Sequence, residues 1–176
     1  QSVALSPGAN TITVVAKDAS TAQNATTVSI TVNYTPPDTT GPAVAITSHV
    51  NNQTVTSSPI TVAGSASESG LGDNGVSSVT VHGLTATGGT ASGSATANWS
   101  QSVALNPGAN TITVIAKDAS AAQNATTVSI TINYNPPDTT GPAVAITSHS
   151  NNQTVTSSPI TVAGTASDSG LGNDGI

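Results

Sequence analysis

The chain has 176 residues, of which only 6% are charged and 2% aromatic, and its formal net charge is −6. Its two lysines and its lack of arginine exclude the basic surface that nucleic-acid binding requires, and its lack of cysteine excludes disulfide bonds and thiolate metal sites. No apolar run approaches the roughly 20 residues needed to span a bilayer, and we expect any export signal to lie outside this sequence.

The sequence repeats itself with a period of 100 residues. Residues 1–76 align with residues 101–176 without a gap, and 65 of the 76 aligned pairs are identical. One complete copy therefore spans 38–137, after the C-terminal part of another copy in 1–37 and before the N-terminal part of a third in 138–176. Such self-similarity at a fixed period is typical of tandem domains.

The partial copies leave two interpretations open. Because the chain starts and stops inside copies and not at the "PPDTTGP" linkers, we expect it to be a window on a longer array, such as one unit of a continuous fibre. In the alternative, half-domains of neighbouring chains complete each other by strand exchange. We favour the first interpretation, because each composite domain of the second would lack the segment 77–100.

Apolar and polar residues alternate along most of a copy, which predicts strands with one buried face. In chain order, the expected strands of the complete copy are 43–48 (A), 58–67 (B), 76–83 (C), one edge strand within 83–98 (D), 99–105 (E), 111–118 (F) and 126–134 (G). The residues expected to face the core are Val44, Ile46, Ile60, Val62, Val79, Val81, Trp99, Val103, Leu105, Ile112, Val114, Val128, Ile130, Ile132 and Tyr134. About seven short strands in 100 residues predict an all-β, Ig-like sandwich. The partial copies would then supply strands E–G in 1–37 and strands A–B in 138–176.

The acidic residues have a restricted distribution. A complete copy carries four of the chain's eight acids: Asp38, Glu68, Asp73 and Asp118. Successive strands of an antiparallel sandwich alternate in direction, so the start of strand A, the B–C loop and the F–G turn share one pole. We therefore expect all four carboxylates to meet at that pole.

Carboxylates gathered in this way repel one another, and a bound cation would relieve the repulsion. Calcium takes about 6–8 oxygen ligands in flexible geometry, and glycine-rich turns such as "SGLGDNG" allow backbone carbonyls to surround an ion. The predicted calcium ligands are Asp38, Glu68, Asp73, Asn74 and Asp118, with Asp18, Asp138, Asp168 and Asp174 as their counterparts in the partial copies. The alternative is that these acids only cap turns or are solvated, and for Asp118 a turn cap is an equal candidate.

The motifs "DTTGPAVAITS", "NWSQSVALNPGANTITVIAKDAS" and "NATTVSITINY" resemble the Ig-like repeats of bacterial surface adhesins and filament proteins. They are also similar to the Ig-like domain of the glucodextranase type. The resemblance implies an extracellular spacer, adhesin stalk or fibre without catalytic residues. Some adhesin repeats with a loop similar to "DSGLGNDGI" bind calcium at their domain junctions.

We therefore expect a structural protein of the bacterial surface or extracellular space, a tandem Ig-like stalk or fibre with junctions rigidified by calcium. Its partners would be neighbouring repeats of the same chain or filament. The alternative is an adhesin or carbohydrate-binding module that takes a host or cell-surface glycan, but aromatic residues are scarce and Trp99 is expected in the core. No Ser–His–Asp arrangement or nucleophile elbow points to an enzyme.

Overall fold

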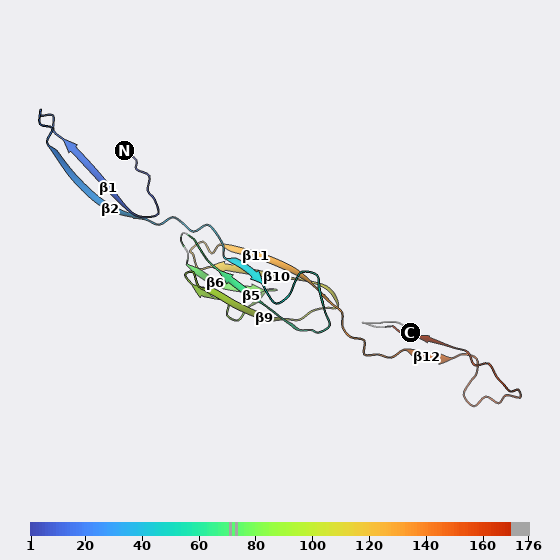
Figure 1. Cartoon of the computed structure of the whole chain (residues 1–176). Helices are drawn as coiled ribbons and strands as arrows, with labels where there is room; N and C mark the ends of the chain where they lie inside the picture. The colour runs from blue at the N-terminus through green and yellow to red at the C-terminus, as the bar shows by residue number, and fades with distance from the viewer. Residues whose placement is uncertain (71, 73, 170–176) are drawn as a thin grey trace.

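The computed structural model describes residues 1–70, 72 and 74–169, and these residues form strands and no helices (Figure 1). The strands are β1 (Gly8–Lys17), β2 (Ala25–Tyr34), β3 (Ala43–Ile46), β4 (Gln53–Val55), β5 (Ile60–Ser67), β6 (Gly75–Val81), β7 (Leu84–Thr85), β8 (Ala91–Ser92), β9 (Thr96–Val103), β10 (Gly108–Asp118), β11 (Ala125–Tyr134), β12 (Ala143–Ile146) and β13 (Gly164–Ser167). Within the described part of the chain, no helix is present that could cross a membrane.

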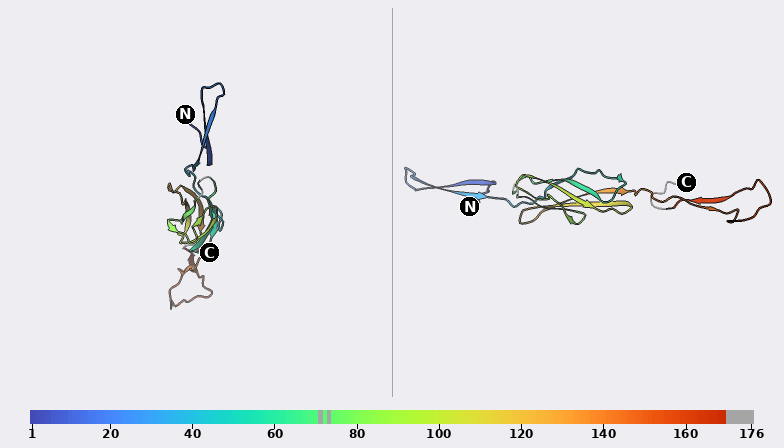
Figure 2. Two further views of the ribbon diagram at one scale, coloured as in Figure 1. Left: turned by 90° about the vertical axis from the view of Figure 1, so that its left-hand side faces the viewer. Right: turned by 90° about the horizontal axis from the view of Figure 1, so that it is seen from below.

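Strands β3 to β11 build an Ig-like sandwich of two sheets, which confirms the predicted fold class. One sheet has the order β3-β5-β9, and the other has the order β4-β11-β10-β6-β7 with β8 also paired to β6. The pairs are antiparallel, except that β4 runs parallel to the end of β11. Figure 2 shows the two layers of the sandwich from its end and from below.

The core lies between the two sheets and contains most of the residues that the alternating pattern predicted, while five others are partly buried and pack against it: Val44, Ile46, Val128, Ile130 and Tyr134. Val62, Val79, Val81, Ile112, Val114 and Ile132 are all fully buried. Trp99 is 2% exposed, as expected for a core residue, and its ring packs over Gly64. An added Cβ on Gly64 would overlap both the Trp99 ring and the backbone of β3. A glycine in the middle of β5 therefore makes room for the largest side chain of the core.

Three details differ from the expected strands. The single edge strand D is wrong, because the segment forms two short strands, β7 and β8, and one isolated bridge between Thr87 and Ser100. Strand E begins at Thr96, three residues earlier than expected. Strand β4 was not predicted, since three residues carry no readable alternation and β4 exists through its pairing with β11.

The partial copies form an antiparallel hairpin, β1–β2, and an antiparallel pair, β12–β13. The expected strand E in residues 1–7 is not formed. In the complete copy this strand, β9, pairs with β5, and residues 1–37 contain no counterpart of β5. Side chains that are core residues in the complete copy are exposed here: Val114 is 0% exposed and its counterpart Val14 63%, while Val62 is 0% exposed and Val162 60%. The apolar face of the third copy lines an open hollow of about 710 Å³.

Candidate metal centre

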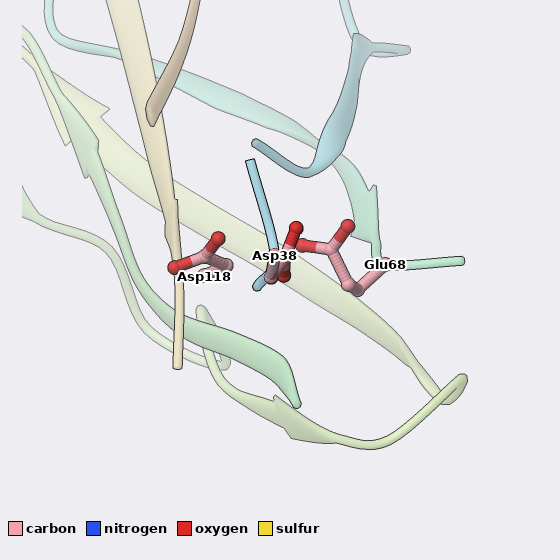
Figure 3. A group of neighbouring side chains, drawn as sticks. All are labelled: Asp38, Glu68 and Asp118. Carbon is pink, nitrogen blue, oxygen red and sulfur yellow. The ribbon is translucent and has the colours of Figure 1, made fainter. Parts of the chain in front are cut away.

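Three acidic side chains meet at one pole of the sandwich: Asp38, Glu68 and Asp118, here called the acidic cluster. One oxygen of each lies within 4.8 Å of the others. Asp38 belongs to the linker before β3, Glu68 follows β5 directly, and Asp118 ends β10. In Figure 3, Asp38 lies between Glu68 and Asp118. The alternating strand directions bring these three ends together, as the order of the strands along the chain predicts.

The acidic cluster is largely withdrawn from water. Asp118 is fully buried, Glu68 is 4% exposed and Asp38 is half-buried. Lys117, the residue next to Asp118 in the chain, is exposed, as the alternation of side chains along a strand requires. Buried carboxylates this close together are costly without a compensating charge. The arrangement therefore suits a cation that takes oxygen ligands.

Hydrogen bonds within the F–G turn hold Asp118 in place. Its Oδ1 accepts hydrogen bonds from the backbone N–H of Ser120 (3.1 Å) and from the Ser120 hydroxyl (2.8 Å), and its Oδ2 accepts one from Asn124 Nδ2 (2.8 Å). Burial raises the pKa of Asp118, but these hydrogen bonds from Ser120 and Asn124 outweigh it, so the pKa lies below its ordinary value. Asp118 is therefore a carboxylate at neutral pH, with one lone pair on Oδ2 left for another partner.

The same turn forms in the first partial copy. Asp18 Oδ1 accepts from the Ser20 N–H (3.1 Å) and hydroxyl (2.6 Å), and Asp18 Oδ2 accepts from Asn24 (3.0 Å). These hydrogen bonds from Ser20 and Asn24 lower the pKa of Asp18. No acidic cluster surrounds Asp18 in the described residues. Asp118 is therefore a turn cap, as the alternative interpretation held, and the turn also presents it to the acidic cluster.

Asp38 is oriented by the linker itself. Its Oδ1 accepts from the Thr40 N–H (3.0 Å) and hydroxyl (3.3 Å), whereas its Oδ2 is buried without a hydrogen-bond partner. A buried oxygen of this kind calls for an explanation such as an ion or a water molecule. Asn124 Nδ2 also donates to the backbone oxygen of Asp38 (3.2 Å) and so connects the linker to the F–G turn. Hydrogen bonds to one oxygen, which leave the other for a cation, are typical of carboxylate ligands.

The B–C loop closes over the linker next to the acidic cluster. Gly72 has φ +87°, and an added Cβ would lie 2.9 Å from the Cβ of Asp38. Between the loop, the linker and the F–G turn lies a hollow of about 260 Å³. Its lining residues are Thr35, Pro36, Pro37, Asp38, Gly72, Asn74, Ser120, Ala121 and Ala122. The loop therefore brings further backbone and amide oxygens to the junction between linker and sandwich.

The other predicted ligands are placed less completely. Asp73 and Asp174 lie outside the described residues, and Asn74 is exposed and lines the hollow. Asp138 and Asp168 are half-buried in the third copy, where Asp138 accepts the same hydrogen bonds from Thr140 as Asp38 does from Thr40. Asn124 was not predicted as part of the site. The sequence feature that could have indicated its role is its position six residues after an aspartate, a spacing that recurs at Asp18 and Asn24.

Comparison with known proteins gives one family. No match is found among curated proteins. A family model described as "Glucodextranase, domain B" matches residues 42–135, which is more than half of the chain and includes the sandwich from the residue before β3 to the residue after β11. The matched region contains Glu68 and Asp118 and begins four residues after Asp38. The chain belongs to the glucodextranase domain B family.

Proposed function

We propose that the chain is part of an extracellular stalk or fibre of tandem Ig-like domains, and that calcium rigidifies the junctions between them. The observation that supports this proposal is the origin of the acidic cluster. Asp38 comes from the linker, and Glu68 and Asp118 come from the sandwich that follows it. A cation held by all three would fix the direction in which the linker enters the sandwich.

The chemistry favours calcium over other divalent ions. The donors are carboxylate oxygens, with amide and backbone oxygens nearby, and no cysteine is present in the chain. Such oxygen sets suit hard cations, and a site built from a linker and two loops suits the flexible coordination of calcium better than the strict octahedron of magnesium. Extracellular calcium modules in general bind with Kd values on the order of 10⁻⁴–10⁻³ M.

The protein surface supports a structural role more than glycan recognition. Trp99, the sole tryptophan, is buried in the core, so it offers no stacking platform to a sugar. The outer faces of the strands carry mainly serine and threonine, and the prolines at 36 and 37 stiffen the linker by restricting φ. The repeated sequence would yield a rod of similar units, each about 30–40 Å long for strands that rise about 3.3 Å per residue.

Calorimetric titration of the whole chain with CaCl₂ tests the metal proposal. We expect about one ion per complete copy, a weaker response to MgCl₂, and loss of binding in Asp118→Asn. The matched control is Asp18→Asn, which removes the same charge from the same turn outside the acidic cluster. Small-angle scattering with calcium and with a chelator then tests rigidity, and identical scattering curves from a calcium-loaded and a stripped sample would refute the junction role.

A further inference from the structure

The chain enters and leaves the sandwich at opposite poles. Asp38 lies beside Asp118, at the end of β10 where β11 begins, and the chain leaves after Tyr134, which pairs with Gly108 at the other end of β10. The ten residues of β11 separate the two points by about 30 Å at ~3.3 Å per residue. Figure 1 shows the linkers at the two ends of the sandwich. Tension along the chain would therefore act parallel to the strands.

The second strand after the entry, β4, is paired with β11, the last strand before the exit. β4 runs parallel to the end of β11, with Gln53 opposite Ile132 and Val55 opposite Tyr134. Three further hydrogen bonds extend this pairing: Asn52 N–H to Thr131 O (2.7 Å), Thr131 N–H to Asn51 Oδ1 (2.8 Å) and Asn135 N–H to Val55 O (2.9 Å). We call β4, β11 and these hydrogen bonds the β4–β11 clamp.

The parallel direction determines how the clamp responds to tension. β4 is pulled from its N-terminal side toward the entry pole, and β11 is pulled from its C-terminal side toward the exit pole. The two strands can separate only by sliding along each other, so their lateral hydrogen bonds are strained together and not one after another. From this topology we propose that the sandwich is a tension-bearing module, in which the β4–β11 clamp sets the unfolding force.

The acidic cluster would protect the segment in front of the clamp, a step that rests on the proposed calcium site. Residues 38–52 reach the clamp through the linker and β3. Gly41 packs so closely on Ala125 that an added Cβ would lie 2.7 Å from its carbonyl carbon, and Pro42 is fully buried. A cation bridging Asp38 to the ends of β5 and β10 would fasten this segment at its first residue. Without the cation, tension would detach it before the clamp breaks.

Single-molecule pulling of the whole chain from its two ends tests both parts. Clamp failure should release roughly 300 Å at ~3.3–3.6 Å per extended residue. Detachment of residues 38–52 should release about 30 Å, because these residues reach about 50 Å when extended but already span about 23 Å of the sandwich, from Ala125 to Ile132 along β11. In chelator we expect this 30 Å step at low force before the main event, and in calcium we expect the two to merge. A 30 Å step that is equal in both buffers, or never seen, would overturn the protective role of the acidic cluster, while the clamp is tested separately by the variants below.

Two variants test the clamp independently of calcium. Asn51→Ala removes the acceptor for the Thr131 N–H and should raise the unfolding rate at fixed force roughly 2–12-fold, from the net worth of one hydrogen bond. Val62→Ala removes a fully buried side chain of the other sheet. In calcium, we expect that sheet to be still intact when the clamp breaks. The substitution should lower thermal stability more than Asn51→Ala does, yet leave the forced unfolding rate nearly unchanged. A forced unfolding rate that rises more in Val62→Ala than in Asn51→Ala would refute the clamp.

Discussion

Replacing Asp38 by asparagine separates two effects of the acidic cluster: the repulsion between its carboxylates and its proposed binding of calcium. The substitution removes one of three charges but keeps an oxygen that can accept the hydrogen bonds from Thr40. In a chelator, we expect the complete copy to become more stable, because two repulsive pairs disappear. In calcium, we expect the same variant to be less stable than the parent, because a ligand is lost. One substitution should therefore have opposite effects in the two buffers.

The distances in the acidic cluster set the magnitude. Two unit charges at 4.8 Å, the upper limit of the separations in the acidic cluster, repel by about 0.9 kcal/mol at the dielectric constant of water and about 3.5 kcal/mol at an effective value of 20. Removing Asp38 deletes two such pairs, which corresponds to about 2–7 kcal/mol. Since 1 kcal/mol shifts the midpoint of a domain of this size by about 4–8 °C, even the lower bound raises the chelated Tm by roughly 7–15 °C. Calcium at 100 times its Kd stabilises the parent by about 2.7 kcal/mol.

Thermal unfolding by circular dichroism at pH 7.5, in excess chelator and in excess calcium, measures both effects. Asp138→Asn is the matched control, because Asp138 receives the same hydrogen bonds from Thr140 but lies in the third copy, and it should leave both midpoints of the complete copy unchanged. A chelated Asp38→Asn variant that melts below the parent would refute the calculation of repulsion. A variant whose response to calcium equals that of the parent would refute the assignment of Asp38 as a ligand.

Three further predictions follow from the same contacts. Asn124→Ala removes the donor to Asp118 and to the Asp38 backbone and should cost about 1.5–3 kcal/mol of unfolding free energy in urea titrations, whereas Asn24→Ala should change nothing in the complete copy. Gly64→Ala should abolish or strongly destabilise the sandwich, since its Cβ would overlap Trp99 and β3, while Gly164→Ala should leave the melting of the complete copy intact. Burial raises the pKa of Asp118 but its hydrogen bonds lower it below the ordinary 3.8, so the stability it contributes is present above about pH 4 and is lost as the pH falls through the lowered pKa. Acid titration of the chelated protein should then show a shallower loss of stability in Asp118→Asn than in the parent, and an unchanged slope would contradict the assigned direction.

Much of the fold follows from alternation and strand direction. The buried positions of β5, β6, β10 and β11 were readable because one face of each strand packs against the other sheet. The meeting of Asp38, Glu68 and Asp118 was predictable because alternating strands place these three ends at one pole. Both arguments need only the order of the strands and the two-residue alternation of apolar and polar side chains, so neither depends on the exact residues at which a strand begins or ends.

The rest depends on contacts that no local pattern encodes. Residues 53–55 form β4, while the identical residues 153–155 form no strand, since the partner β11 exists only in the complete copy. The role of Asn124 rests on its distance to a linker carbonyl 86 residues away. The segment between β6 and β9 was misjudged because glycine-rich sequence with little alternation allows two short strands as readily as one.

The dependence of β4 on β11 has a consequence for biogenesis. In a copy emerging from the ribosome, the sheet that contains β4 stays incomplete until its last strand, β11, has been made, so each copy closes only near the end of its own synthesis. Meanwhile its uncovered apolar face matches the F–G hairpin of any neighbouring copy, because the two sequences are nearly the same. Near-identical copies in one chain would therefore be exposed to mispairing between neighbours until the closing strand arrives. Folding of each copy as a unit, from the N-terminus onward during synthesis, would limit this risk.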